Sequence, residues 1–119
     1  MSSCIFCKIA QGEIPSEVVY ETDKVIAFKD LHPVAPIHVL IIPKVHLADL
    51  NDLATSAQRA ELMEEVLQAT QALCKLYGTS SFNLISNCGE EAGQSVFHLH
   101  FHFISGVDLT KKIAATALA

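Results

Sequence analysis

Apolar residues along the chain follow first a strand-like pattern, then a helical period, and then a strand-like pattern again. Two β-rich runs, 18–20 and 25–28, flank a short turn around Asp23, which is typical of a β-hairpin. The sequence "HVLIIP" predicts a third strand that ends at Pro43. The sequences "SFNLISN" and "SVFHLHFHFI" predict a fourth and a fifth strand, with the glycine-bearing loop "CGEEAGQ" between them.

One long helix is predicted between residues 55 and 77. Thr55 and Gln58 fit a capping box at its start, and Gly78 fits the left-handed residue beyond its end. Near the N-terminus, "CIFCKIAQGE" predicts a short helix or turn that stops at Gly12, whereas the tail 107–119 has no pattern that places it. The apolar positions of the long helix recur three and four residues apart: Leu62, Met63, Val66, Leu67, Thr70, Leu73, Cys74 and Tyr77.

Length and composition favour one globular domain over residues 1–119. Of the 119 residues, 50% are apolar and 18% are charged, so the chain is long enough to bury a core. The net charge is −5, and the Lys and Arg residues are scattered. A long nucleic acid is therefore not an expected partner, because such binding needs clustered cations. A small anion in a pocket is compatible, since a few local donors can outweigh a weak overall field.

Nothing in the sequence indicates a membrane span or a secretion signal. No run approaches the roughly 18 apolar residues of a membrane helix, and no basic region precedes the short apolar run at the N-terminus. We therefore expect a cytoplasmic, reducing location and no membrane partner. There, cysteines are thiols or metal ligands before they are disulfides: Cys4, Cys7, Cys74 and Cys88.

Three histidines alternate with apolar residues in "SVFHLHFHFI". On one strand, His98, His100 and His102 would share a face, and the apolar residues would pack on the helix from the other face. His98 and His102 would lie about 13 Å apart, whereas zinc–ligand bonds are about 2 Å long. All three rings therefore do not converge easily on one ion, but neighbours can share a metal or a phosphate group. One neutral imidazole can attack phosphorus while a protonated neighbour donates to the oxygens.

The motif His98-Leu99-His100-Phe101-His102-Phe103-Ile104 resembles the signature of the histidine triad (HIT) superfamily, in the branch of histidine triad nucleotide-binding proteins (Hint). Four further blocks resemble the family in the expected order: "IFCKIAQGEIPS", "VIAFKD", "APIHVLIIPKVH" and "NCGEEAGQSVFH". The resemblance covers roughly residues 4–106. It implies an α+β fold with a five-stranded antiparallel sheet, which pairs across a two-fold axis into a ten-stranded sheet in a homodimer.

The same resemblance implies a nucleotide hydrolase that acts at the α-phosphate. His100 would attack phosphorus and carry the nucleotidyl group until water releases the nucleoside monophosphate, and no cofactor is needed for this chemistry. His102 and His38 match the accompanying histidines, and Ser95 matches a serine that hydrogen-bonds the phosphate or the leaving group. The remaining nucleotide contacts implied are Asp30 at the ribose, Asn87 near the phosphate, and apolar walls around the base, namely Ile5, Phe6, Ile9, Phe28 and Leu31.

Each of these assignments has a simpler alternative. Asp30 could be a turn residue before the proline-containing loop, and Asn87 and Ser95 could hold their own loop together. The apolar residues could be plain core for most of their area. The resemblance gives His32 no role, and the tail matches nothing in the family, which leaves substrate selectivity open.

Cys4 and Cys7 have the spacing of half a tetrahedral metal site. A redox dithiol is disfavoured, because no thioredoxin-like βαβ pattern surrounds the pair. By resemblance to a zinc-binding subset of the superfamily, His46 in "PKVH" and His98 are the other two ligands of a structural zinc. An unmetallated pair of cysteines is the alternative. Cys74 falls on the apolar stripe of the long helix and is expected in the core.

Two classes of function follow. The enzyme would be a purine nucleoside phosphoramidase that releases AMP or GMP, or a dinucleoside polyphosphate hydrolase, which differs only in the leaving group. The other class is a nucleotide-binding or scaffold protein with vestigial activity. The presence of His100, His102 and Ser95 favours the enzyme. We also expect His100 and His102 to share one proton near neutral pH, because like charges at close range disfavour each other.

Overall fold

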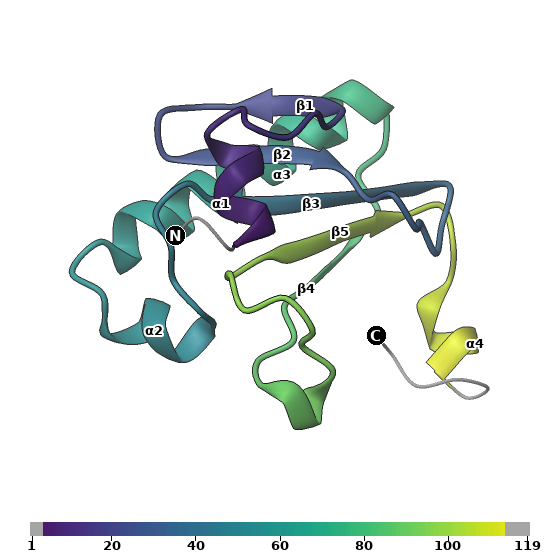
Figure 1. Cartoon of the computed structure of the whole chain (residues 1–119). Coiled ribbons are helices and arrows are strands. Elements are labelled where there is room, and N and C mark those ends of the chain that lie inside the picture. Colours follow the sequence, from purple (N-terminus) through teal and green to yellow (C-terminus); the bar gives the residue numbers. More distant parts are fainter. Residues whose placement is uncertain (1–3, 114–119) are drawn as a thin grey trace.

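A computed structural model describes the backbone of residues 4–113 and the side chains of residues 4–111. Antiparallel strands form a five-stranded sheet in the order β1-β2-β3-β5-β4, as Figure 1 shows. The prediction of an α+β fold with five antiparallel strands is confirmed. The strands are β1 (Val18–Glu21), β2 (Val25–Lys29), β3 (Ile37–Pro43), β4 (Asn83–Ile85) and β5 (Phe101–Ser105).

Helices cover the two faces of the sheet unequally. The long helix α3 (Arg59–Tyr77) lies behind the sheet in Figure 1, and the short helix α1 (Ile5–Ala10) lies in front of it. Side chains alternate between the faces, so Ala27, Val39 and Ile41 pack on the α3 side. The residues next to them along the strands face the other way and form a second cluster with Phe6 and Ile9 of α1. These residues are Ile26, Phe28, Leu40 and Ile42.

The predicted hairpin is confirmed, and Thr22 explains its turn. The Thr22 hydroxyl oxygen accepts hydrogen bonds from the amides of Lys24 and Val25, both at 3.2 Å. The same hydroxyl donates to Glu65 Oε1 on α3 at 2.8 Å. One side chain therefore closes the turn and ties the hairpin to the helix behind the sheet.

The helical region contains two helices rather than one. Helix α2 (Leu50–Thr55) ends where the single helix was predicted to begin, so the capping box of Thr55 and Gln58 is wrong. The Gln58 side chain makes no capping hydrogen bond to α3. The side-chain cap occurs earlier, because the Asp49 carboxylate accepts from the Asp52 amide at 3.0 Å and caps α2.

The rest of the helix prediction is largely confirmed. Gly78 ends α3 in the left-handed conformation, with φ of 66°. The apolar stripe is buried against the sheet, with Cys74 at its edge. Leu67 is the error, because its side chain is 56% exposed. The face toward the sheet instead includes Ala69, which is fully buried.

The fifth strand is shorter than predicted. Pairing with β3 spans only residues 101–105, so His98 and His100 lie in the segment that leads into the strand. The Leu99 amide donates to the Leu47 carbonyl at 2.6 Å, which draws this segment toward the loop after β3 and away from the sheet ladder. The apolar side does pack on α3 from Leu99 onward, but Phe97 is 48% exposed.

A short helix, α4 (Leu109–Ile113), follows β5. Among the described residues, no helix is both long enough and apolar enough to span a membrane. The last six positions of the tail discussed above lie outside the described residues.

Candidate active site

Three histidines converge on the α1 side of the sheet. His38 comes from β3 and His102 from β5, two neighbouring strands, and His38 Nε2 lies 2.9 Å from His102 Nδ1. His100, just before β5, lies edge-on to His102 with ring centroids 5.2 Å apart. Phe6 of α1 covers His100, with ring centroids 5.1 Å apart. The side chains of a helix, two strands and a connecting segment therefore form one aromatic cluster.

The hydrogen bonds of His100 determine which of its nitrogens carries the proton. Its Nδ1 lies 2.8 Å from the His98 carbonyl oxygen, which can only accept a hydrogen bond. Nδ1 therefore carries the hydrogen of the neutral ring. Nε2 is left with its lone pair, as a nucleophile requires.

The opposite tautomer follows for His102. The Val34 amide donates to His38 Nδ1 at 3.1 Å, so the neutral His38 ring carries its hydrogen on Nε2. That Nε2–H donates to His102 Nδ1, and the neutral His102 ring must then carry its own hydrogen on Nε2. We call this chain from the Val34 amide through His38 to His102 the histidine relay. It makes His102 a hydrogen-bond donor without a positive charge.

Burial keeps these rings neutral. Burial, together with the neighbouring His100 and His38, lowers the pKa of His102 to about 4. Burial also lowers the pKa of His38, against an opposing effect of Asp30, and the pKa of His100, against opposing effects of its bond to the His98 carbonyl and of Asp30. The expectation that His100 and His102 share one proton near neutral pH is therefore wrong. Donor and acceptor are both present at pH 7 in neutral rings.

Asp30 is a turn residue, as the simpler alternative expected, and its carboxylate also lies close to the histidine relay. Its Oδ1 accepts from the His32 amide at 2.8 Å, and its Oδ2 lies 3.4 Å from His38 Nε2. Ligand atoms of Asp30, His38 and His102 lie within 4.8 Å of one another, as a metal site would require. A metal there would need the lone pair of His38 Nε2, but the Val34 amide already uses the Nδ1 lone pair of that ring. The hydrogen bonds therefore favour a proton relay over a cation site.

The apolar residues assigned to the base divide into buried and exposed ones. Phe6, Ile9 and Phe28 are buried together beside His100, and the Phe6 and Phe28 rings are 5.6 Å apart. Ile5 is 49% exposed and Leu31 is 88% exposed, so these two add no buried wall. Contact of all five with a base stays a prediction.

Asn87 and Ser95 lie on the loop between β4 and β5 that leads into the histidine segment. Asn87 is half-buried and Ser95 is exposed. Their contacts with phosphate stay predictions. The Ser86 hydroxyl ties the start of this loop to the His100 carbonyl at 2.8 Å.

Gln94 holds the same loop and was missed in the sequence. Its side chain is buried, with Oε1 accepting from the Gly89 amide at 2.8 Å. Its Nε2 donates to the carbonyls of Ala48 at 2.7 Å and Val96 at 3.0 Å. A glutamine in a polar loop gives no sequence signal of burial, so only its tertiary partners show that it anchors the segment before His98.

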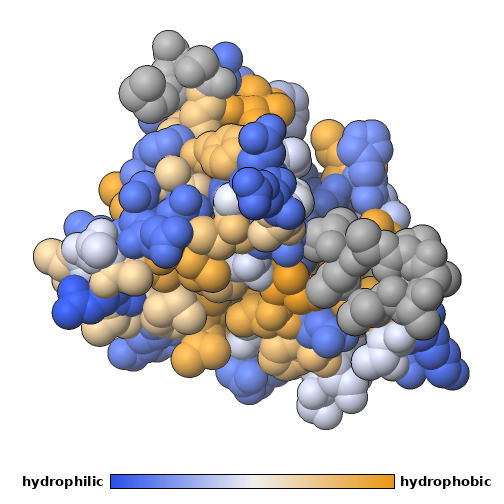
Figure 2. Space-filling model, turned by 90° about the horizontal axis from the view of Figure 1, so that it is seen from below, coloured by the Kyte–Doolittle hydropathy of each residue, from blue (hydrophilic) through white to orange (hydrophobic). Residues whose placement is uncertain are grey.

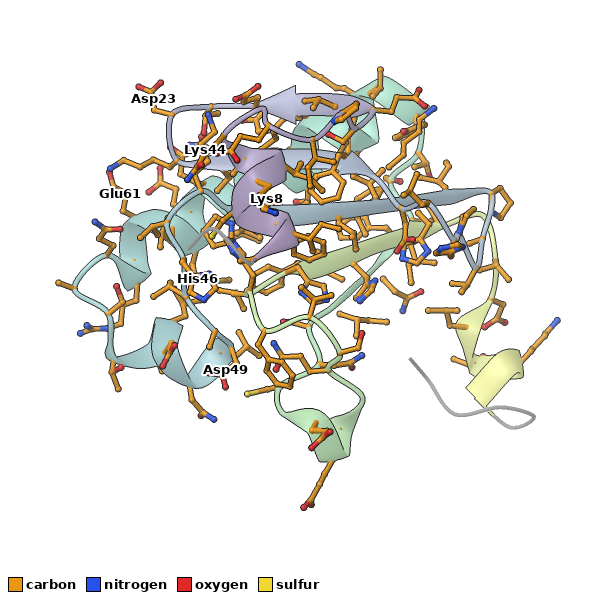
Figure 3. The ribbon with its side chains drawn as sticks, in the orientation of Figure 1. Lys8, Asp23, Lys44, His46, Asp49 and Glu61 are labelled. Carbon is orange, nitrogen blue, oxygen red and sulfur yellow. The ribbon has the colours of Figure 1, made fainter. Side chains whose placement is uncertain are left out.

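Cys4, Cys7, His46 and His98 form a group that can hold a metal ion, as predicted. We call these four residues the metal-binding group. Nδ1 of His98 lies 3.4 Å from Cys4 Sγ and 3.5 Å from Cys7 Sγ, and Nδ1 of His46 lies 3.2 Å from Cys7 Sγ. A tetrahedral ion with bonds of about 2.0–2.3 Å separates its ligand atoms by about 3.3–3.8 Å. Figure 3 shows His46 reaching toward the N-terminal end of α1.

Protonation also suits this group to a metal. The Nε2–H of His98 donates to the Pro43 carbonyl at 2.8 Å, which leaves Nδ1 with its lone pair facing the cysteines. Burial lowers the pKa of His98, so the ring is neutral at pH 7. Burial and the neighbouring Cys4 raise the pKa of Cys7. A bound cation would offset that cost by stabilising the thiolate.

Comparison with known proteins supports the same family over most of the chain. The sequence pattern of the HIT domain matches residues 11–109. Protein HitA of Neisseria gonorrhoeae is 43% identical over 105 residues, covering 87% of this chain and 96% of that protein. The purine nucleoside phosphoramidase of Escherichia coli is 35% identical over 116 residues, covering 96% of each.

Solved structures agree with the sequence comparison. A histidine triad protein from Clostridium difficile superposes with a TM-score of 0.85 at 43% identity, covering 92% of this chain and 95% of that chain. A HIT family hydrolase from Legionella pneumophila gives a TM-score of 0.83 at 41% identity, covering 90% and 96%. Domain pattern, relatives and fold all lead to one assignment. The chain belongs to the HIT domain family.

Proposed function

We propose that this chain is a nucleotide hydrolase of the Hint branch that acts at the α-phosphate through a covalent nucleotidyl intermediate on His100. Its substrate is a purine nucleoside phosphoramidate, and its product is AMP or GMP. The observation that carries this proposal is the pair of opposite tautomers, with a lone pair on His100 Nε2 and a hydrogen on His102 Nε2. A nucleophile and a neutral donor on adjacent rings serve phosphoryl transfer. The name of the Escherichia coli relative supports the substrate class.

The first half of the reaction uses both rings. The lone pair of His100 Nε2 forms a bond to phosphorus, and the bond from phosphorus to the leaving nitrogen breaks. The leaving nitrogen takes the proton from His102 Nε2, which leaves a negative charge on the His102 ring. The positive charge that His100 gains offsets that negative charge. The His98 carbonyl, which accepts from His100 Nδ1, stabilises that positive charge.

Water completes the reaction in the second half. Its oxygen bonds to phosphorus, the bond from His100 Nε2 to phosphorus breaks, and one water proton returns to His102 Nε2. The ring tautomers of the resting protein are thereby restored. Ser95 and Asn87 bind phosphate oxygens in this proposal, Asp30 binds the ribose, and Ile5, Phe6, Ile9, Phe28 and Leu31 surround the base.

A direct comparison of substrates tests the proposal. We expect kcat/KM for an adenosine phosphoramidate to exceed that for a diadenosine polyphosphate, because the neutral His102 donor suits a leaving nitrogen that must gain a proton. The two kcat/KM values, measured side by side with the same protein, give the specificity directly. A clear preference for the polyphosphate would assign the chain to the alternative hydrolase class. AMP binding without hydrolysis of either compound would indicate a binding module.

We also propose a homodimer, in which the β4 edges of two chains meet and complete a ten-stranded sheet. Strand β4 lies at one edge of the sheet, where backbone groups can pair with a further strand. Figure 2 looks at this side of the molecule and shows apolar residues gathered between polar ones. Light scattering during size-exclusion chromatography should give about twice the chain mass of 12.9 kDa. A mass that stays at that of one chain at all concentrations would contradict the dimer.

In the proposed function, the metal-binding group takes zinc, and its role is structural. Two sulfur and two nitrogen ligands are typical of tetrahedral zinc sites, and four protein ligands leave no open position for substrate. Zinc would tie α1 to the loop after β3 and to the histidine segment. A reducing cytoplasm, which keeps Cys4 and Cys7 as ligands, is the location that we propose.

A further inference from the structure

His98 belongs to two networks at once. Its side chain is fully buried in the metal-binding group, with Nδ1 3.4 Å and 3.5 Å from the two cysteine sulfurs. Its backbone carbonyl accepts from His100 Nδ1 at 2.8 Å, the bond that leaves the lone pair on His100 Nε2. The position of the His98 backbone therefore affects both the tautomer and the orientation of the His100 ring.

Helix α1 makes a second connection between the same two places. Cys4 caps the helix, where its sulfur accepts from the Cys7 amide at 3.3 Å, and Phe6 lies between these two residues. The Phe6 ring lies edge-on to His98, with centroids 6.0 Å apart, and edge-on to His100, at 5.1 Å. A shift of the cysteines would therefore move the aromatic ring that covers His100.

The backbone of the histidine segment lies outside the sheet ladder. Residues 98–100 precede β5 and take no part in its pairing with β3. The bond from the Leu99 amide to the Leu47 carbonyl and the bond from the Ser86 hydroxyl to the His100 carbonyl anchor the backbone of the segment. The buried Leu99 side chain and the bond from His98 Nε2 to the Pro43 carbonyl hold it as well. A metal ion would add bonds that link positions far apart in sequence, 4 and 7 with 46 and 98.

We propose that metal binding by Cys4, Cys7, His46 and His98 positions His100 for attack. In this proposal, which rests on the proposed function, the four ligands are positioning residues that act through the His98 carbonyl and through Phe6. Loss of the metal loosens the His98 backbone, so the His100 ring adopts a mixture of orientations and tautomers. Contact with the base through Ile5 and Phe6 of α1 shifts with the same helix, so nucleotide binding also weakens, whereas Asp30, assigned to the ribose, lies outside the metal-binding group.

His46→Ala is the suitable variant, because His46 is exposed and its side chain contacts Cys7 and His98 of the metal-binding group. His32→Ala is the matched control, since His32 is an exposed histidine outside both networks. Bound zinc should be about one per chain in the wild type and the control, and much lower in the variant. We expect kcat for an adenosine phosphoramidate, measured at saturating substrate, to fall about 10–100-fold in the variant, a larger factor than the rise in the Kd for AMP.

Nuclear magnetic resonance supplies a readout independent of turnover. The ring Nδ1–H of His100, assigned by its absence in His100→Ala, should give a slowly exchanging signal in zinc-loaded wild type. Removal of zinc with a chelator should weaken or split that signal, and added zinc should restore it, while the amide signals of β2 and β3 stay in place. If the zinc-loaded wild type shows this response but hydrolyses no phosphoramidate, the proposed function fails and the positioning link stands. An unchanged His100 signal after zinc removal, a protein that binds no zinc, or an equal kcat in His46→Ala would overturn the link.

Discussion

The substitution His100→Ala should lower kcat/KM for an adenosine phosphoramidate by at least about 10⁴-fold. The reason is that His100 Nε2 has the lone pair that attacks phosphorus, and alanine offers no group to replace it. His102 Nε2 carries a hydrogen in the neutral ring, so it cannot substitute as the nucleophile. The rate of AMP release, measured by chromatography with equal amounts of each protein, gives the size of the effect.

The histidine at position 32 provides a control for this substitution. Its side chain is exposed, and His32→Ala removes an imidazole without touching the cluster around His100. We expect this variant to retain wild-type activity. Equal release of AMP by wild type and His100→Ala would remove His100 from the mechanism. Activity in none of the three proteins would favour a nucleotide-binding module.

Acidification should destabilise the protein strongly between about pH 6.5 and pH 4. The folded state holds His102 neutral, with a pKa lowered from 6.5 to about 4 by burial and by its histidine neighbours. In this range the unfolded chain binds a proton that the folded chain rejects, so the free energy of unfolding falls as the pH falls. The difference in pKa corresponds to about 3 kcal/mol from His102 alone. His38 and His100 change the stability in the same direction.

Urea unfolding of the wild type and of His102→Phe at several pH values measures this effect. Phenylalanine fills the space of the ring but does not titrate, so the variant should lose about 3 kcal/mol less stability over the same pH range. An equal loss in both proteins would show that His102 does not carry the acid sensitivity.

The same low pKa values place the acid limb of kcat/KM below the ordinary histidine range, and they predict no loss of activity on the alkaline side from His102.

Much of the fold could be predicted because its central strands are short apolar runs bounded by turn residues. The continuous apolar runs of β2 and β3 and the turn around Asp23 were sufficient for a hairpin and a central strand. The capping box failed because Thr55 and Gln58 match a local pattern that tertiary packing does not use, while Asp49 and Asp52 cap a separate helix. Local patterns of this kind compete, and the sequence alone does not show which of them the chain adopts.

The histidine segment shows a different limit of sequence analysis. Alternation predicted one strand for His98, His100 and His102, but the Leu99 amide pairs with the loop after β3. The turn of His98 toward the cysteines was expected from the resemblance. The tautomers were beyond prediction, because they depend on the Val34 amide and on two backbone carbonyls. The shared proton was wrong because the expectation used the ordinary histidine pKa, and only the fold reveals how deeply the rings are buried.

The stereochemistry of hydrolysis at phosphorus tests the covalent intermediate on His100 most directly. The probe is an adenosine phosphoramidate made chiral at phosphorus by one sulfur atom, hydrolysed in water enriched in heavy oxygen. Each in-line displacement inverts phosphorus, so attack by His100 followed by attack by water predicts overall retention of configuration. This result does not depend on accumulation of the intermediate. Inversion would show that water attacks the substrate in a single step, and it would contradict the covalent mechanism.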